Sequence, residues 1–314
     1  MKKLLFLIPL VFFLSACKNQ EDSIQKGMLY LNSVYNDGRY DDQYLLYVYP
    51  SEKLECPLEN CNLTYRLMDA YFNDIFIKEE VRNHDIMKKQ IEDADKILQS
   101  IIPIWEKEKV YNTIKGEKDG LALDTYCILG FIYNNSKMAS TVKESLTGDN
   151  WMKDDYYKGL DDWRNIADES WCVRLFIKTG YPSEEVIEKE VKDTYTFLEG
   201  EHYDMSKVVA AMHTLYVLHD ANLLNEDFFF FQDYIAEKNS LFEDDMLYQS
   251  NVLEALSKTG YKDKALLEKI AARLKEGQAD DGAWYLYKYT KEKNGQVFTT
   301  FRAVLALNDY ENKK

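Results

Sequence analysis

The segment Thr300-Phe301-Arg302-Ala303-Val304-Leu305 is apolar on more than one helical side, which is typical of a helix buried all round. Five earlier segments have a similar pattern and begin at Thr64, Thr125, Ser170, Lys207 and Gln249. The first residues of the six segments lie 61, 45, 37, 42 and 51 positions apart. This internal period of about 47 residues predicts an array of helical hairpins.

Between the buried segments we expect amphipathic helices, with one apolar face and one solvent-exposed face. Pro182-Ser183-Glu184-Glu185 opens such a helix, with Ser183 as the N-cap and acids in the first turn. Another runs from the N-cap Asp263 to Gly277. Repeated pairs of this kind can close into a ring or remain an open solenoid. Six pairs in about 290 residues favour an all-α, closed (α/α)6 toroid as a single domain over residues 28–314, with an open HEAT-like solenoid as the alternative.

The first seventeen residues predict where the protein resides. Lys2 and Lys3 precede the apolar run Leu4–Leu14, which is too short for the roughly 20 residues of a membrane-spanning helix. The following Leu14-Ser15-Ala16-Cys17 resembles a bacterial lipobox. The resemblance implies a lipoprotein signal peptide over residues 1–16, lipidation of Cys17 and a tether over residues 17–27. We therefore expect a lipid anchor at the extracytoplasmic face of the bacterial cell membrane; the alternative is ordinary secretion with a coincidental cysteine.

The charge balance argues against a nucleic-acid partner. The chain has 39 Lys and Arg against 54 Asp and Glu, a formal net charge of −15. Removal of residues 1–16 takes away two further positive charges, Lys2 and Lys3, and leaves about −17. A body with this charge repels phosphate backbones. The four histidines, few for metal chemistry, lead us to expect no metal and no cofactor.

Four cysteines remain after the lipobox. Cys56 and Cys61 are close enough in sequence to close a small disulfide loop outside the cell, and we favour this slightly over two free thiols. Cys127 and Cys172 lie in apolar runs, and we expect both to be small buried hydrophobic residues.

A family resemblance appears in the last repeat. Gln278-Ala279-Asp280-Asp281-Gly282-Ala283-Trp284 resembles the QxxDGxW repeat, or QW motif, of squalene–hopene cyclases and related terpenoid cyclases. Protein prenyltransferase β subunits use the same α/α toroid. The match extends over about 45 residues, and the rest of the chain matches only through its period. In that family the motif is structural: the glutamine caps a neighbouring helix and the tryptophan stacks beside the turn. The resemblance thus implies that Gln278, Asp281, Gly282 and Trp284 are braces rather than catalytic groups.

The chemical motifs of these enzymes are missing from the sequence. Class II terpenoid cyclases protonate their substrate with a D-x-D-D acid, which does not occur in this chain. Prenyltransferases hold zinc with an Asp-x-Cys pair, whereas Asp124 and Cys127 are three positions apart. The Cys/Cys/His zinc site of lanthionine cyclases has no recognisable counterpart. We therefore expect neither cyclase nor prenyltransferase activity.

A closed ring leaves a central funnel, and we expect the beginnings of the inner helices to line it. The prediction is that this funnel binds a glycan, a peptide or a lipid. The candidate ligand-binding residues are Tyr65, Tyr126, Trp171, Tyr248, Gln249, Thr300 and Arg302. The alternative is a carbohydrate-active enzyme, a glycoside hydrolase or lyase, that uses Asp124 and Glu169 as a carboxylate pair. Against this alternative, acids near helix beginnings commonly serve as caps and dipole partners.

Overall fold

The computed structural model describes residues 22–36, 38–40, 54–55, 62–63, 65–106, 123–146, 163–287 and 296–312. In this part of the chain helices dominate, which confirms the all-α class. The strands among these residues are two-residue segments that form two antiparallel pairs: β1 (Tyr35–Asn36) with β2 (Arg39–Tyr40), and β3 (Leu54–Glu55) with β4 (Asn62–Leu63). A search of the described helices for a span long and apolar enough to cross a membrane found none.

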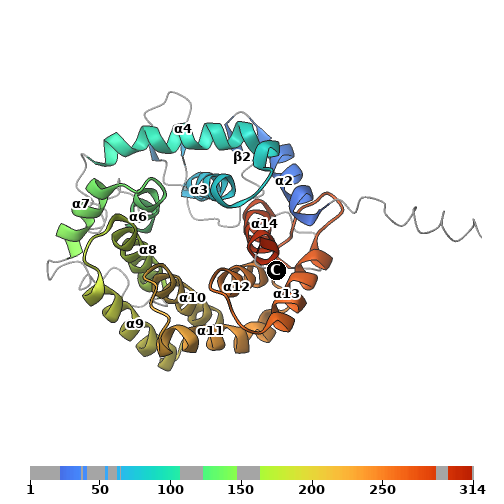
Figure 1. Ribbon diagram of the computed structural model, residues 1–314. Coiled ribbons are helices and arrows are strands. Elements are labelled where there is room, and N and C mark those ends of the chain that lie inside the picture. The colour runs from blue at the N-terminus through green and yellow to red at the C-terminus, as the bar shows by residue number, and fades with distance from the viewer. Residues whose placement is uncertain are drawn as a thin grey trace, which may run out of the picture.

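The helices lie in two concentric layers (Figure 1). Those nearest the centre are α3 (Tyr65–Glu80), α6 (Leu123–Ile132), α8 (Trp163–Thr179), α10 (Asp204–Asp220), α12 (Met246–Lys258) and α14 (Gln296–Asn312). The outer ones are α2 (Ser23–Val34), α4 (Lys88–Trp105), α7 (Ser136–Leu146), α9 (Glu184–Glu199), α11 (Glu226–Lys238) and α13 (Lys264–Gly277). Two 3-10 helices, η2 (His84–Met87) and η4 (Asn239–Phe242), precede α4 and α12. Each of the six segments predicted to be buried falls on a different inner helix.

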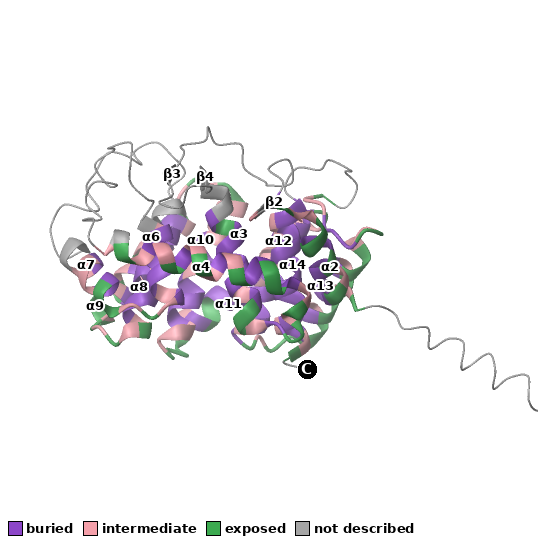
Figure 2. Cartoon of the chain, turned by 90° about the horizontal axis from the view of Figure 1, so that it is seen from above, coloured by how far each residue is buried: buried purple, intermediate pink, exposed green. Residues whose placement is uncertain are grey.

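Contacts run from helix to helix around the centre. Each inner helix packs against the next one in the chain, and α14 packs against both α3 and α2. Helix α14 therefore meets the first two helices among the described residues, and the contacts are consistent with a helical-hairpin toroid. Figure 2 shows buried residues on the inner helices and exposed residues along the outer ones.

The turns that lead from an inner to an outer helix share one backbone conformation. Each contains a residue in the left-handed region, namely Asn83, Asn134, Gly180, Asn222 or Gly260. At the Lys-Thr-Gly-Tyr repeats, the N–H of Tyr181 donates to the carbonyl of Phe176 at 3.0 Å, and Tyr261 donates to Leu256 at 2.9 Å. This is the Schellman ending of a helix, which needs a glycine or asparagine at the left-handed position. The recurring turn brings the ends of the inner helices to one face of the molecule.

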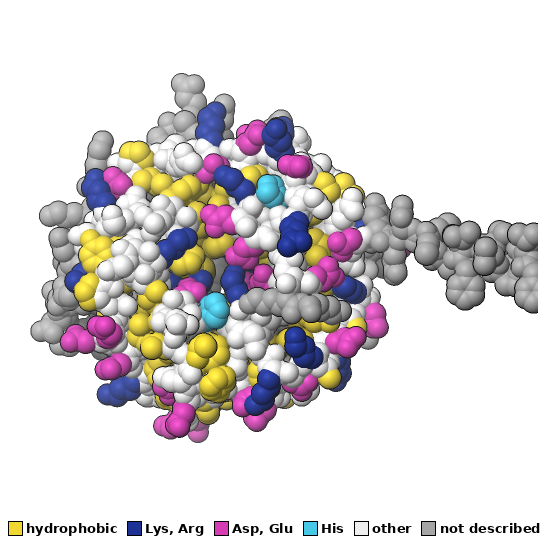
Figure 3. All heavy atoms as spheres, viewed as in Figure 1, with side chains coloured by type: hydrophobic (Ala, Val, Ile, Leu, Met, Phe, Trp, Pro, Cys, Tyr) yellow, Lys and Arg dark blue, Asp and Glu magenta, His cyan; other side chains and the backbone are white. Residues whose placement is uncertain are grey.

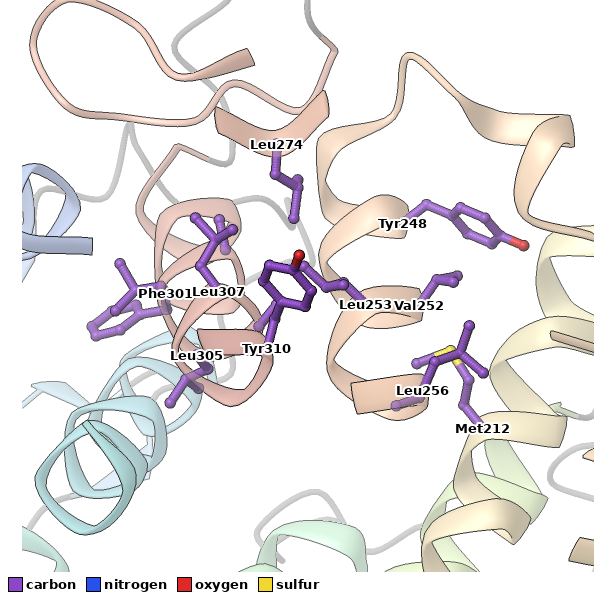
Figure 4. Close-up of a cluster of buried hydrophobic side chains, with 14 of the residues drawn as sticks. Met212, Tyr248, Val252, Leu253, Leu256, Leu274, Phe301, Leu305, Leu307 and Tyr310 are labelled. Carbon is purple, nitrogen blue, oxygen red and sulfur yellow. The ribbon is translucent and has the colours of Figure 1, made fainter. Parts of the chain in front are cut away.

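Figure 4 shows how an inner helix is buried on more than one side. From α12, Leu253 points toward Leu307 and Tyr310 of α14, while Val252 and Leu256 point toward Met212 of α10. These side chains are all almost fully buried. Burial of one such aliphatic side chain contributes about 1.5–3 kcal/mol, so the lateral contacts between inner helices are a main source of stability.

A disulfide joins two inner helices, contrary to the prediction for its cysteines. Cys127 of α6 and Cys172 of α8 are bonded, with their Cα atoms 4.9 Å apart. Both side chains are buried, as expected, but they are not free thiols. Residues 45 positions apart become neighbours because α6 and α8 pack side by side, which sequence spacing alone does not show.

The domain begins earlier than the predicted boundary at residue 28. Helix α2 starts at Ser23, and the Asp22 side chain caps it by accepting a hydrogen bond from the N–H of Ile24. Ile24 and Met28 are buried on its inner face. Part of the predicted tether is therefore the first turn of an outer helix. Residues 1–16, Cys17, Cys56 and Cys61 lie outside the described residues.

Candidate functional site

The QW-like turn ties three helices together. The Gln278 side-chain amide donates to the carbonyls of Ser23, at 2.8 Å, and Gly282, at 2.9 Å. Trp284 is fully buried, and its indole N–H donates to the carbonyl of Leu274 at 2.7 Å. Its backbone N–H donates to the Thr300 hydroxyl at 3.0 Å. The turn thus connects the end of α13, the beginning of α14 and the first turn of α2. An N-terminal cap accepts a hydrogen bond from a backbone N–H. The Gln278 amide instead donates to a carbonyl of α2, so it links two segments and does not cap the helix.

Glycine is required where α2 crosses this turn. Gly282 has φ +92°, and a Cβ atom there would overlap the carbonyl oxygen of Lys26. The Asp281 carboxylate accepts a hydrogen bond from the N–H of Ala283 at 3.1 Å and stabilises the turn. These contacts hold α2 against the connection between α13 and α14.

Most of the residues predicted to line a funnel are packed into its walls. Gln249 is fully buried and donates to the carbonyls of Asn239 and Phe242. Tyr248 and Tyr126 are buried as well, and Thr300 is bonded to Trp284. The side chain of Tyr65 lies outside the described residues. Among the described members of this group, Gln249 and Thr300 bond to different neighbours.

Asp124 and Glu169 are engaged with different neighbours. Asp124 accepts hydrogen bonds from the N–H and hydroxyl of Thr125. Glu169 is buried, and each of its carboxylate oxygens lies 3.3 Å from the ammonium group of Lys189 on the outer helix α9. Burial raises the pKa of Glu169 to about 7, against the lowering effect of Lys189. Glu169 therefore faces outward, and its contacts do not connect it with Asp124.

Charged side chains gather at the opposite ends of the inner helices. Figure 3 shows the face that carries the C-terminus: it is hollowed at its centre, and Lys, Arg, Asp and Glu side chains surround the hollow. We call the following group, which comes from α3, α8, α10, α12 and α14, the central charge cluster. Its members are Glu80, Arg174, Lys178, Tyr216, Asp220, Glu254, Lys258, Arg302 and Asp309. All except Arg302 lie in the last two turns of their helices.

The cluster bridges helices that are not neighbours in the ring. The ammonium group of Lys258 on α12 lies 2.8 Å from the Glu80 carboxylate on α3, although α14 stands between these helices. Arg174 of α8 and Arg302 of α14 both act electrostatically on Tyr216 of α10. Side chains from separate parts of the wall therefore converge on the centre.

Three ion pairs organise the cluster. The Nε of Arg174 lies 2.6 Å from the Asp220 carboxylate. An Nη of Arg302 lies 2.6 Å from Glu254, and its Nε donates to Asn251 at 3.0 Å. The third pair is Lys258 with Glu80. Burial alone would raise the pKa of Asp220, but the Arg174 guanidinium and His219 lower it to about 2.

Aromatic rings hold the Arg174 guanidinium in place. Its central carbon lies 4.3 Å from the ring centre of Trp171, 4.7 Å from that of Phe131 and 5.3 Å from that of Tyr216. These rings come from α8, α6 and α10. Cation–π contacts of this kind contribute roughly 0.5–2 kcal/mol each. Among the predicted ligand-binding residues, Trp171 contacts Arg174 of the central charge cluster, and Arg302 is a member of that cluster.

Two buried groups in the same region carry no charge at neutral pH. The hydroxyl of Tyr216 is buried and has no hydrogen-bond partner among the described residues. Burial, followed by the Glu254 charge, raises the pKa of Tyr216 well above its usual range. Nδ1 of His213 lies 2.9 Å from the Ser170 hydroxyl, and burial together with Arg174 and Arg302 lowers the pKa of His213 to about 3.

A sequence signal for this cluster exists. The repeated Lys-Thr-Gly-Tyr endings place Lys178 and Lys258 at equivalent positions, two residues before the left-handed glycine. Two lysines at matching inner-helix ends indicate a charged rim. The candidate ligand-binding residues predicted from the sequence are expected instead near the beginnings of the inner helices.

The described residues include no group of three or more His, Cys, Asp and Glu side chains suited to hold a metal ion. Comparison of the sequence with models of protein families and with curated proteins gives no significant match. The properties of this site therefore have to be argued from its own geometry.

Proposed function

We propose that this chain is a membrane-anchored extracytoplasmic lipoprotein whose (α/α)6 toroid binds a polar ligand in its central hollow. The observation that carries the proposal is the convergence of the central charge cluster on a hollowed face. Structural ion pairs alone do not require a buried hydroxyl without a partner, and Tyr216 has one. A buried polar group that lacks a hydrogen bond costs about 1–3 kcal/mol, which a bound ligand would offset.

The chemistry of the hollow favours a glycan or a peptide over a lipid. Arg174, Arg302 and Lys258 belong to the central charge cluster, and each is paired with an acid. An apolar chain placed there would desolvate these charges without replacing their hydrogen bonds with water. Hydroxyl and amide groups can accept and donate to such fixed ion pairs.

The rest of the proposal has separate support. The contacts of α14 with α3 and α2 support ring closure, and the QW-like turn supports the likeness to the terpenoid cyclase and prenyltransferase toroid. A buried disulfide suits a protein that folds outside the reducing cytoplasm, as the lipobox-like Cys17 implies. Without the D-x-D-D acid, binding without cyclisation is the simplest role for this scaffold.

A binding screen with a matched pair of variants tests the site. Isothermal titration calorimetry on the protein against mono- and oligosaccharides and short peptides identifies ligands. Tyr216→Phe should weaken binding about tenfold, because it removes one hydrogen bond to the ligand, and should leave stability unchanged or slightly higher. Tyr261→Phe is the control, because its hydroxyl donates to Asp233 on the outer helix α11. Equal affinities for both variants, or binding of no member, would refute the proposal.

The anchor is tested separately in a bacterial host. Metabolic labelling with radioactive palmitate should label the wild-type chain, and Cys17→Ser should remove the label and release the protein from the membrane fraction. A labelled Cys17→Ser protein, or an unlabelled wild type, would contradict lipidation at this residue.

A further inference from the structure

The donors left over at the central hollow indicate what kind of group the ligand carries. Resting on the proposed function, we infer that the hollow receives a carboxylate of the ligand, bound by the terminal amino groups of Arg174 with Lys178 and the Tyr216 hydroxyl beside them.

Arg174 has unused donors in a fixed position. Its Nε donates a hydrogen bond to Asp220, and no described residue accepts a hydrogen bond from its two terminal amino groups. Its side chain is only 8% exposed, and three rings hold the plane of the guanidinium. A guanidinium that presents two parallel N–H groups matches the two oxygens of a carboxylate. Because the rings already fix the side chain, little rotamer entropy is lost when a ligand binds.

A second cation, Lys178, lies near the Arg174 guanidinium. The ammonium group of Lys178 lies 4.2 Å from the ring centre of Phe131, the same ring that contacts Arg174. Lys178 is exposed at the end of α8 and forms no ion pair with a described residue. An anion that enters from the hollowed face would meet Lys178 first and Arg174 below it.

Tyr216 is the third group beside Arg174. Its ring contacts the guanidinium, and its buried hydroxyl lacks a partner among the described residues. A hydroxyl can donate to a carboxylate oxygen that the arginine also binds. Arg174, Lys178 and Tyr216 thus place donor groups near one another, which calls for an acceptor on the ligand at this part of the hollow.

The local charge favours one negative charge rather than two. The cluster contains four cations (Arg174, Lys178, Lys258 and Arg302) and four carboxylates (Glu80, Asp220, Glu254 and Asp309), so its formal charge sums to zero. A carboxylate adds a single charge, whereas a phosphate adds up to about two beside four acids. The chain's charge of −15 further disfavours a dianion, although salt at about 0.15 M screens charges more than about 8 Å apart.

The test uses pairs of probes that differ only at the carboxylate. The wild-type protein is titrated calorimetrically with glucuronate against glucose, and with N-acetylalanine against its amide. The acid should bind at least about tenfold more tightly than its neutral partner in at least one pair. If the neutral partner binds as well as the acid, the carboxylate inference is wrong while the proposed function stands. If neither acid binds up to about 0.1 M, the inference is also wrong, and only the wider screen then decides the proposed function.

Two variants locate the effect. Arg174→Lys keeps the charge but removes the two parallel N–H donors, so the preference for the acid should fall about tenfold. Arg273→Lys, which alters an arginine paired with Glu243 at the outer helix α13, should preserve it. Lys178→Gln changes an exposed residue and should reduce the preference severalfold. The control is Lys192→Gln on the exposed side of α9. An acid preference that survives both Arg174→Lys and Lys178→Gln would overturn the inference.

Discussion

The two ends of the inner helices differ in what they contribute. At the beginnings, Trp284, Thr300 and Gln249 are buried and spend their polar atoms on backbone or neighbouring side chains. At the other ends, Arg174 and Tyr216 keep polar atoms that no described residue satisfies. The beginnings of the inner helices therefore hold neighbouring helices together, whereas the other ends carry the groups that we propose to bind a ligand.

The difference follows from how the two kinds of connection are built. Turns from inner to outer helices are short and repeat one left-handed geometry. The connection from α13 to α14 instead folds the QW-like turn over α2 and fills the space with Trp284. Substitutions at the beginnings should therefore change stability, and substitutions at the ends should change binding.

The largest expected effect is at Trp284. Trp284→Ala removes a fully buried ring and its hydrogen bond to Leu274, and should lower the free energy of unfolding by about 3–5 kcal/mol. Urea denaturation followed by circular dichroism measures this. Tyr203→Ala is the control, because Tyr203 is 79% exposed and should cost less than about 0.5 kcal/mol. A loss below about 1 kcal/mol at Trp284 would mean that the turn is not a brace.

The disulfide comes next. Replacement of Cys127 and Cys172 by serine opens a link between residues 45 positions apart, for which chain entropy predicts a loss of about 4 kcal/mol, with measured effects often smaller. The comparison of oxidised and serine-substituted proteins by denaturation, with thiol quantification, checks the bond and its contribution together. Two titratable thiols in the native, unreduced protein would contradict the disulfide.

Two glycines distinguish the stability cost of a steric clash from the cost of an unfavourable backbone conformation. Gly282 and Gly260 both have positive φ, 92° and 74°, but only at Gly282 would a Cβ meet another segment. Gly260→Ala should cost about 1 kcal/mol, and Gly282→Ala about 2–3 kcal/mol because α2 must also move. Equal losses in the two variants would show that α2 does not press on the turn.

The pH dependence of stability should have opposite signs at two acids. Glu169 has a raised pKa of about 7, so its contribution is present below about 4.5 and is lost as the pH rises toward 7. Asp220 has a lowered pKa of about 2, so its contribution is present above about 3.8 and is lost as the pH falls. Each should change the free energy of unfolding by about 1.4 kcal/mol per pH unit at most.

Denaturation of Glu169→Gln and Asp220→Asn between pH 3 and pH 8 tests these signs. Glu169→Gln should flatten the fall toward neutral pH only in part, because burial also raises the pKa of Glu190. Asp220→Asn should flatten the fall toward acid pH. The same sign of change in both variants would contradict the placement of these two groups.

Sequence reasoning predicts the helices well and the site poorly, for a physical reason. The period of buried segments such as Thr300–Leu305 follows from local hydrophobic patterning, which a single chain displays. Which end of an inner helix faces an open hollow depends instead on how distant connections pack. The pairing of Cys127 with Cys172 and of Lys258 with Glu80 depends on the ring geometry, and neither is visible in sequence spacing.

The central claim is that ligand occupies the hollow at the ends of the inner helices. Lysine acetylation followed by mass spectrometry, with and without a ligand from the screen, tests this directly. Lys178 lies at the end of α8, and Lys207 lies near the beginning of α10. The account predicts that ligand slows acetylation of Lys178 severalfold and leaves Lys207 unchanged. Protection of Lys207 with an unaltered rate at Lys178 would place the ligand at the opposite end and contradict it.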